Sequence, residues 1–410
     1  MVSIHAALAV VFIVIMSAVL WVFRKRIIVQ KLLGPLLYFV MLRTTWGIGL
    51  MDWFGSRFRR LMQWFGYASI VIGFLGMALI TYQLVKSTLM LFLTPEAAPG
   101  IQPVLPFEAK GVFFVPFAYW IISIFVIAVI HEFAHGVLAR AHNITVKSSG
   151  FAFLAALVPV IPAAFVEPDE KQLVKRPASQ QLSVFAAGPV ANIFMAVAMV
   201  FLFGIDASPL IPYDVTSRTA IFDVTEVGTS LITFSHFEVN KIEPNSPAFR
   251  AGLAIGDKIT AVDGIPVSER DRTLERITSL KPNEAVTLSI GDRDVQILLG
   301  EHPEDATRGY LGIGFSTATE YAQDALAKYG ELGVQTLLFF ISLIIWVFIL
   351  SIGIGLFNLI PLGPIDGGRM LKLALERLTG SPSGGMRIWK GVSMAILGMV
   401  IVNLIVGFVR

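Results

Sequence analysis

Long, nearly uninterrupted stretches of apolar residues dominate the pattern along this chain. Six of them are about 18 to 27 residues long, which is the length that an α-helix needs to cross about 30 Å of hydrocarbon. We therefore predict six transmembrane helices, at residues 6–23, 64–85, 112–137, 182–204, 334–360 and 391–408. Basic residues follow the first stretch and none precedes it, so we expect a retained span with its N-terminus outside rather than a secretory signal.

Two further apolar segments do not have the character of full spans. Residues 32–50 carry Arg43 in their middle, which favours a helix lying in the membrane interface. Residues 150–165 are short and interrupted by Pro159 and Pro162, which favours a re-entrant or interfacial segment.

The stretch between residues 205 and 330 has the composition of a soluble domain. It holds 19 of the 29 acidic and 11 of the 32 basic residues, so it carries −8 while the rest of the chain carries +11. Elsewhere the basic residues gather in the connections at 24–60, 139–180 and 369–390. Since cytoplasmic loops of membrane proteins are enriched in Lys and Arg, we expect these connections inside and the acidic domain outside.

Composition excludes several classes of protein. The 410 residues are 55% hydrophobic and only 15% charged, against about 25% charged in an ordinary soluble domain. This composition excludes a soluble enzyme and a disordered chain. A net charge of +3 gives no reason to expect a nucleic-acid partner. With no cysteine in the chain, disulfides and thiolate metal sites are excluded, and any metal must be held by His, Asp or Glu.

The third predicted span contains the chain's clearest chemical motif, His131-Glu132-x-x-His135. Residues four apart share one face of a helix, so both imidazoles can bind one zinc ion. Glu132 lies about 100° round the helix and can act as general base. The alternative is a helix end whose polar residues meet the interface, but ionisable residues inside a membrane are costly and usually functional.

A catalytic zinc usually has three protein ligands, so a distant residue must complete the site. From Val112 to His131 the predicted helix rises about 28 Å, which puts the motif near the cytoplasmic face. The fifth span also runs inward and ends in NLIPLGPIDGGRM, residues 358–370. Asp366 in this segment is either the third ligand or the N-cap of the following helix.

These residues together resemble the site-2 protease family of intramembrane zinc metalloproteases, peptidase family M50. The first motif matches His131, Glu132 and His135, and the second matches Asn358, Pro361, Asp366 and Gly367. A third element, AAGPVAN, spans residues 186–192. The resemblance covers about residues 112–205 and 334–375.

The resemblance implies roles for particular residues. Asp366 would be the third ligand of one zinc ion per chain, and Asn358 would help to position the substrate. The segment that starts with Gly150 and Phe151 would be a membrane re-entrant strand that binds an extended peptide.

Residues 237–267 resemble a PDZ domain of the kind that is inserted in bacterial and archaeal members of this family. EPNSPA predicts a turn and a helix start, Gly252 the end of that helix, and Asp263-Gly264 a hairpin turn. VTLSI and VQILL then alternate as strands around Gly291. PDZ domains bind extended peptide tails by strand addition, and YLGIGF (310–315) is a candidate carboxylate loop. The alternative is a domain that only limits access to the membrane site.

The predicted fold is a polytopic α-helical membrane protein of about six transmembrane helices with an inserted α+β PDZ-like domain. We expect N-terminal helices and a basic segment at 1–111, the first half of the metalloprotease core at 112–205, an extracytoplasmic domain at 206–330 with its PDZ-like module at about 236–315, and the second half of the core at 331–410.

The predicted function is that of a zinc metalloendopeptidase, a multi-pass protein of the cell membrane that cuts transmembrane substrates near the cytoplasmic face in regulated intramembrane proteolysis. One alternative is a membrane zinc peptidase of the prenyl-protein type, which needs a glutamate as third ligand; Glu376 is the nearest and is poorly placed. Another is a non-catalytic scaffold that binds peptide tails through its PDZ-like domain.

Overall fold

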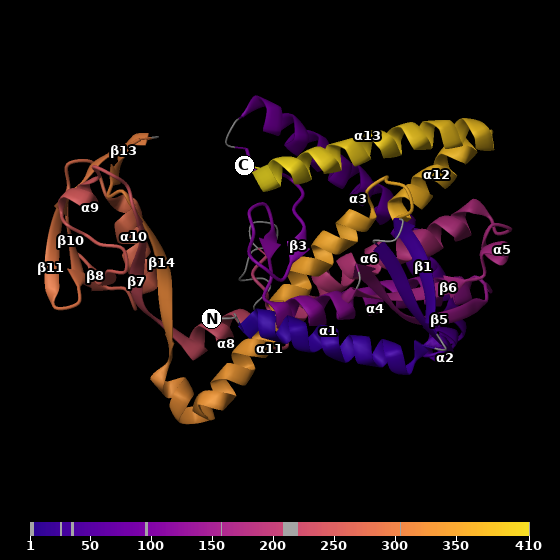
Figure 1. Cartoon of the computed structure of the whole chain (residues 1–410), viewed down its shortest axis with the longest axis horizontal. Coiled ribbons are helices and arrows are strands. Elements are labelled where there is room, and N and C mark those ends of the chain that lie inside the picture. The colour runs from indigo at the N-terminus through magenta and orange to yellow at the C-terminus, as the bar shows by residue number, and fades with distance from the viewer. Residues whose placement is uncertain are drawn as a thin grey trace. The chain divides into compact units, whose positions relative to one another are not determined.

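The computed structural model describes residues 4–24, 27–33, 37–94, 97–156, 158–207, 220–303 and 305–409. The chain divides into two compact units (Figure 1). The first consists of Met1–Ile221 and Ser342–Arg410, and the second consists of Phe222–Ile341. The second unit overlaps the inserted polar domain predicted at 206–330.

Long apolar helices form most of the first unit. Among the described residues, five helices are long and apolar enough to cross a membrane: α3 (Arg59–Leu93), α4 (Phe117–Ala141), α6 (Ala178–Phe203), α11 (Gln323–Asn358) and α13 (Pro382–Val409). They correspond to five of the six predicted spans. The first prediction corresponds to α1 (Ile4–Val22), whose apolar part, as far as the structure describes it, is the shorter stretch Val10–Val22.

The start of the motif-bearing helix differs from the prediction. Phe113–Phe114 form strand β4, which pairs in parallel with β3 (Val104–Leu105), and Pro116 is the N-cap of α4. Proline is favourable where a helix begins, because the missing N–H has no helical partner there. Fourteen residues of α4 therefore precede His131, which is about 21 Å of helix rather than 28 Å.

A four-stranded antiparallel sheet lies against α4. Its order is β1 (Ile27–Leu33), β2 (Leu37–Thr44), β5 (Val146–Ala156) and β6 (Val158–Pro168). The predicted re-entrant segment, 150–165, forms most of the β5–β6 hairpin, and its prolines lie in the edge strand β6, where a missing N–H is tolerated. In Figure 1, β1 belongs to the same sheet as β5 and β6 despite the distance in sequence, and β2 lies between β1 and β5.

The interfacial helix predicted at 32–50 is wrong. Residues 37–44 form β2, of which 38–44 pair with β5, and helix α2 (Ile48–Arg57) begins only after the turn at Gly47. The segment Leu-Tyr-Phe-Val-Met-Leu-Arg-Thr is rich in aromatic and β-branched residues, which favour a strand once a partner strand is present.

Close helix packing positions the second half of the core. Helix α12 (Asp366–Leu378) packs against α13 and α6, and α6 packs against α3 and α4. Glycines permit the approach, since a Cβ on Gly66 of α3 would lie 2.5 Å from Leu138 of α4. The buried core between these helices includes Leu138, Val184, Ala187, Leu359 and Met370.

The second unit contains a sheet of order β11-β10-β8-β7-β14, with β9 paired to β8. Its elements are α8 (Val224–Leu231), β7 (Ile232–Ile242), α9 (Pro247–Arg250), β8 (Lys258–Val262), β9 (Ile265–Pro266), α10 (Arg270–Ser279), β10 (Ala285–Ile290), β11 (Arg293–Leu298), β12 (Gly300–His302), β13 (Asp305–Tyr310) and β14 (Ile313–Tyr321). Its core is formed by apolar residues that alternate along these strands, such as Val239, Val262 and Val286.

The local predictions for this unit agree with the structure. Ser246 caps α9 by accepting the N–H of Phe249, and Asp263 and Gly264, both at positive φ, connect β8 to β9. Strands β10 and β11 pair around Gly291. The region predicted to be PDZ-like is therefore an α+β arrangement, with β14 at one edge of the sheet.

Candidate metal centre and catalytic cavity

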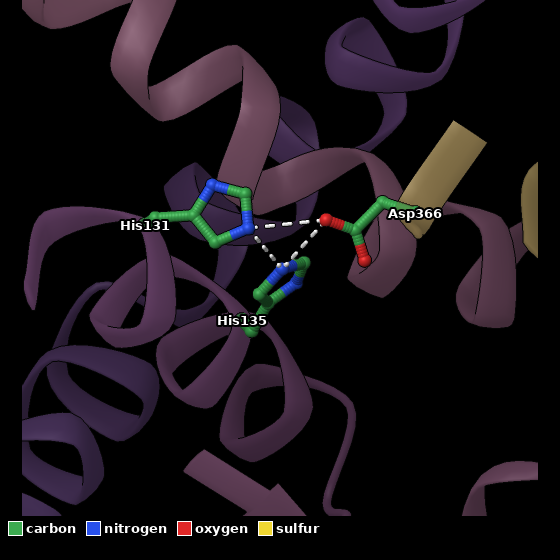
Figure 2. Close-up of side chains that lie close together, drawn as sticks. All are labelled: His131, His135 and Asp366. Atoms are coloured by element: carbon green, nitrogen blue, oxygen red, sulfur yellow. Dashed lines mark hydrogen bonds and ion pairs between the residues drawn. The ribbon is translucent and has the colours of Figure 1, made fainter. Parts of the chain in front are cut away.

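Two histidines of α4 and one aspartate of α12 converge in the first unit. Nε2 of His131 lies 3.1 Å from Nε2 of His135 and 3.1 Å from Oδ2 of Asp366. Nε2 of His135 lies 3.4 Å from the same oxygen. Figure 2 shows the three side chains pointing toward one another. All three are largely withdrawn from solvent, with side-chain exposures of 10%, 12% and 13%.

The alternative of a capping role for Asp366 does not hold. Ile365 is the N-cap of α12, and Asp366 is the first residue of the helix itself. Its carboxylate faces the imidazoles. A carboxylate at a helix N-terminus is also favoured by the helix dipole.

The three ligand atoms have the spacing of a tetrahedral zinc site. Zinc binds histidine nitrogen and carboxylate oxygen at about 2.0–2.2 Å, and atoms at two corners of such a tetrahedron lie about 3.3 Å apart. The observed separations are 3.1, 3.1 and 3.4 Å. In the described part of the chain, His131, His135 and Asp366 form a group whose ligand atoms lie within 4.8 Å of one another. The donor set therefore fits zinc, with a fourth position left for water or substrate.

Helix α6 supports both histidines from behind. Nδ1 of His135 lies 2.6 Å from the carbonyl oxygen of Val184, to which a protonated Nδ1 donates. Four residues on, a Cβ on Gly188 would lie 2.3 Å from Nε2 of His135 and 2.7 Å from Nε2 of His131. Only glycine leaves the metal position open there. The next residue on this stripe, Asn192, is fully buried and faces Nδ1 of His131.

The protonation of His131 determines which way the Asn192 amide faces. Nδ2 of Asn192 lies 3.2 Å from Nδ1 of His131, and Oδ1 has no hydrogen-bond partner within the described residues. A histidine that binds zinc through Nε2 carries its proton on Nδ1 and needs an acceptor there. Exchanging the amide nitrogen and oxygen, which have nearly the same shape, supplies that acceptor.

The close approach of the first turn of α12 to the segment that precedes it depends on two glycines. A Cβ on Gly367 would lie 2.2 Å from the carbonyl oxygen of Leu359, and one on Gly368 would lie 2.4 Å from that of Leu362. Nε1 of Trp389 on α13 donates to the carbonyl of Gly368 at 2.8 Å. The Asp-Gly-Gly sequence thus holds the start of α12 tightly against the end of α11.

A cavity of about 400 Å³ opens over the metal ligands and also contains Glu132 and Asn358. The N–H of Val166 on β6 donates to Oε2 of Glu132 at 3.0 Å. The predicted base and the predicted substrate-positioning amide therefore line the same cavity as the three metal ligands.

Sequence reasoning missed the charged residues around this cavity. The guanidinium of Arg369 lies 4.2 Å from the centre of the Phe185 ring, and its Nη2 lies 3.5 Å from Oε1 of Glu170. Arg369 follows Asp366 by three residues on α12, so helical spacing was the available signal. Glu167 and Glu170 also line the cavity.

Gly150 and Phe151 lie on the strand next to β6, the strand that lines this cavity, and not at the free edge of β6. Both belong to β5, where Gly150 pairs with Arg43 on one side and Phe165 on the other. The strand at this edge of the sheet is β6, and β1 lies at the opposite edge. Peptide binding by these two residues stays a prediction.

His142 follows α4 and takes no part in the site. It is buried, and its Nε2 lies 2.8 Å from Oγ of Ser183. Burial, with the nearby charges of Arg176 and Arg59, lowers the pKa of His142 to about 4. His142 is therefore neutral at physiological pH.

Comparison with known proteins matches this architecture to one family. The family model described as Peptidase family M50 matches residues 119–401, more than half of the chain. The chain is 25% identical over 294 residues to the zinc metalloprotease RasP of Shouchella clausii, covering 59% of this chain and 62% of the relative. It is 27% identical over 255 residues to an uncharacterized protein of Methanocaldococcus jannaschii, covering 62% and 56%.

A further relative is the regulator of sigma-E protease RseP of Escherichia coli, 25% identical over 202 residues, with 35% of this chain and 43% of the relative covered. The chain spans about three fifths of the length of the first two relatives. Zinc is the metal named for the first, in agreement with the His-His-Asp donor set. The five long apolar helices and these relatives together indicate an integral membrane protein. The chain belongs to peptidase family M50.

Proposed function

We propose that the chain is a zinc-dependent endopeptidase that cleaves membrane-spanning protein substrates near the cytoplasmic face of the membrane. The observation that carries this proposal is the convergence of His131, His135 and Asp366 in one cavity with Glu132. Two of the three ligands and the base lie on a helix that is long and apolar enough to span a membrane. Such residues are costly there unless they are used.

The chain's own residues account for proton transfer and positioning. Zinc held by His131, His135 and Asp366 would supply Lewis acidity, which polarises a carbonyl and allows water to ionise near neutral pH. Glu132 takes a proton from water in the cavity and later delivers it to the leaving amine. The Asn358 amide lies in the same cavity and is available to hold the substrate backbone.

The free edge of β6 is the proposed place for the substrate backbone. Because the Val166 N–H points to Glu132 and not to β5, the alternation along a strand directs the Ala164 N–H to the same free edge. A locally unwound substrate segment pairs there as an additional strand, beside the metal ligands. Gly150 and Phe151 on β5 then act from the neighbouring strand.

Two parts of the proposal concern the whole protein. The charge distribution supports basic loops on the cytoplasmic side, with the N-terminus and the second unit outside. In the second unit, the edge strand β14 is available for an extended peptide tail, as in a PDZ domain.

The geometry favours this reading over the two alternatives. A peptidase of the prenyl-protein type needs a glutamate as third ligand, whereas the third ligand atom among the described residues belongs to Asp366. A non-catalytic scaffold has no need for a half-buried carboxylate base beside a donor set of this spacing.

The test is cleavage of a panel of tagged single-span proteins co-expressed with wild type or Glu132→Gln. We expect the variant to lose about 10²–10⁴-fold in cleavage while it keeps its fold and zinc, because only the base is removed. Glu376→Gln is the matched control and should cleave like wild type. Equal cleavage by wild type and Glu132→Gln would contradict the proposal, and loss in Glu376→Gln would favour the prenyl-protein type.

A further inference from the structure

A second cavity, of about 270 Å³, lies directly beside the catalytic cavity. We call it the side pocket, and its walls include Trp46, Met51, Val129, Phe133, Phe151 and Val166. It shares Glu132, Phe165 and Val166 with the catalytic cavity. The hydrogen bond from the Val166 N–H to the Glu132 carboxylate therefore joins two residues that border both cavities.

The side pocket presents an apolar surface. Its two hydroxyl-bearing residues are already hydrogen-bonded: Oγ1 of Thr44 donates to the Ser149 carbonyl at 3.1 Å, and Oγ of Ser149 donates to the Trp46 carbonyl. The remaining walls are aromatic rings and aliphatic chains, apart from Glu132 at the boundary. Such a space suits one large apolar side chain, such as leucine or phenylalanine.

Strand geometry connects the side pocket to a bound peptide. Ser149 pairs with Val166 and Phe151 pairs with Ala164 in the β5–β6 ladder. Directly paired residues have their side chains on the same face of a sheet, so these four share one face, and all four line the side pocket. A residue of a further strand, placed opposite Val166 at the free edge of β6, directs its side chain to this same face.

The N-terminal part of the chain supplies one wall. Trp46, Gly47 and Met51 line the side pocket but precede residues 119–401, the part that matches the family. Met51 is 4% exposed and contacts α4 so closely that a Cβ on Gly136 would lie 2.4 Å from its sulfur. Part of the side pocket's wall is thus formed by residues outside the shared core.

We propose that the side pocket is a specificity subsite that receives a large apolar side chain from a substrate residue next to the cleaved bond. The subsite rests on the proposed function, because the peptide that fills it is the one cleaved beside Glu132. Its preference for one side chain over another is set by Met51 and Val129, which both line it.

A cleavage series tests the preference. The full chain is purified, reconstituted into bilayers and incubated with single-span model substrates whose cleavage site has been mapped. In these substrates, each residue next to the cleaved bond is changed in turn to Gly, Leu, Phe or Asp. At one flanking position we expect Leu or Phe to be cleaved about 10–200-fold faster than Gly, the discrimination typical of apolar pockets. Val129→Phe should fill the side pocket and reverse that order, whereas Ile121→Phe, on the same helix but outside the pocket, should not.

Cross-linking tests the same contact without cleavage. Because the chain has no cysteine, Val129→Cys in a Glu132→Gln background gives a single thiol in the side pocket. We expect disulfide formation to be strongest with a substrate cysteine next to the mapped cleavage site. Cross-linking of equal strength along the whole substrate segment, or an unchanged preference in Val129→Phe with zinc content intact, would overturn the subsite alone. Failure of wild type to cleave any substrate would instead overturn the proposed function and the subsite with it.

Discussion

Asn192 illustrates how a residue that touches no substrate can determine the metal site. Its amide is fully buried and lies against Nδ1 of His131, whose Nε2 faces the other ligands. The interaction fixes the ring's orientation and the position of its proton, provided that the amide presents its oxygen. Groups in this position typically contribute a factor of about 10–100 in metal affinity.

Substitutions at Asn192 test the direction of this hydrogen bond. Asn192→Leu should weaken zinc binding about 10–100-fold, because the Nδ1 proton loses its acceptor. Asn192→Asp keeps an acceptor of the same shape and should bind zinc at least as tightly as wild type. Competition with a chelator measures both affinities. If Asn192→Asp loses as much affinity as Asn192→Leu, the amide donates through its nitrogen and our assignment is wrong.

At the scale of elements, the interaction between the sheet and α4 organises the site. Strand β6 contributes the N–H that holds Glu132, and β5 and β2 extend the sheet away from α4 toward β1. The edge strand thus touches the proposed catalytic base, Glu132, on one side and a paired strand on the other. Any peptide that pairs with β6 is brought to the base.

Proline substitutions separate the free edge of β6 from its paired side. Ala164→Pro removes an N–H that points to the free edge, and we expect substrate cleavage to fall about 5-fold or more, the value of one hydrogen bond. Ala164→Gly keeps the N–H without adding volume to the side pocket and serves as the control. Ala163→Pro removes an N–H that faces β5 and should lower the melting temperature instead. Wild-type cleavage rates in Ala164→Pro would exclude pairing of the substrate at this edge.

The elements also show why part of the site could not be predicted. His131 and His135 followed from helical spacing, because both ligands lie within one turn of the same helix. The wall that Trp46 and Met51 form depends on β2 pairing with β5, as in the hydrogen bond from Thr44 to Ser149, 105 residues apart. An apolar segment with one arginine carries no local signal for such a distant partner, and by itself it favours an interfacial helix.

At the scale of the whole molecule, composition indicates the class of protein but not which distant residues contact one another. The apolar stretches correctly indicated five long helices, and the polar stretch corresponds to the compact unit Phe222–Ile341. The third ligand, Asp366, is 235 residues from His131 and was assigned through the family resemblance rather than through spacing. The contacts of Gly188 and Asn192 with the two histidines could not be predicted from the sequence, where both residues appear only as part of a family motif. These contacts depend on α6 packing against α4.

The zinc content of the purified chain tests the central claim most directly. Metal analysis of wild type should give about one zinc per chain, and Glu132→Gln should give the same, because Glu132 is not a ligand. The zinc content of His131→Ala and of Asp366→Ala should fall close to zero, while each variant retains its helix content. A full equivalent of zinc in either ligand variant would contradict the account.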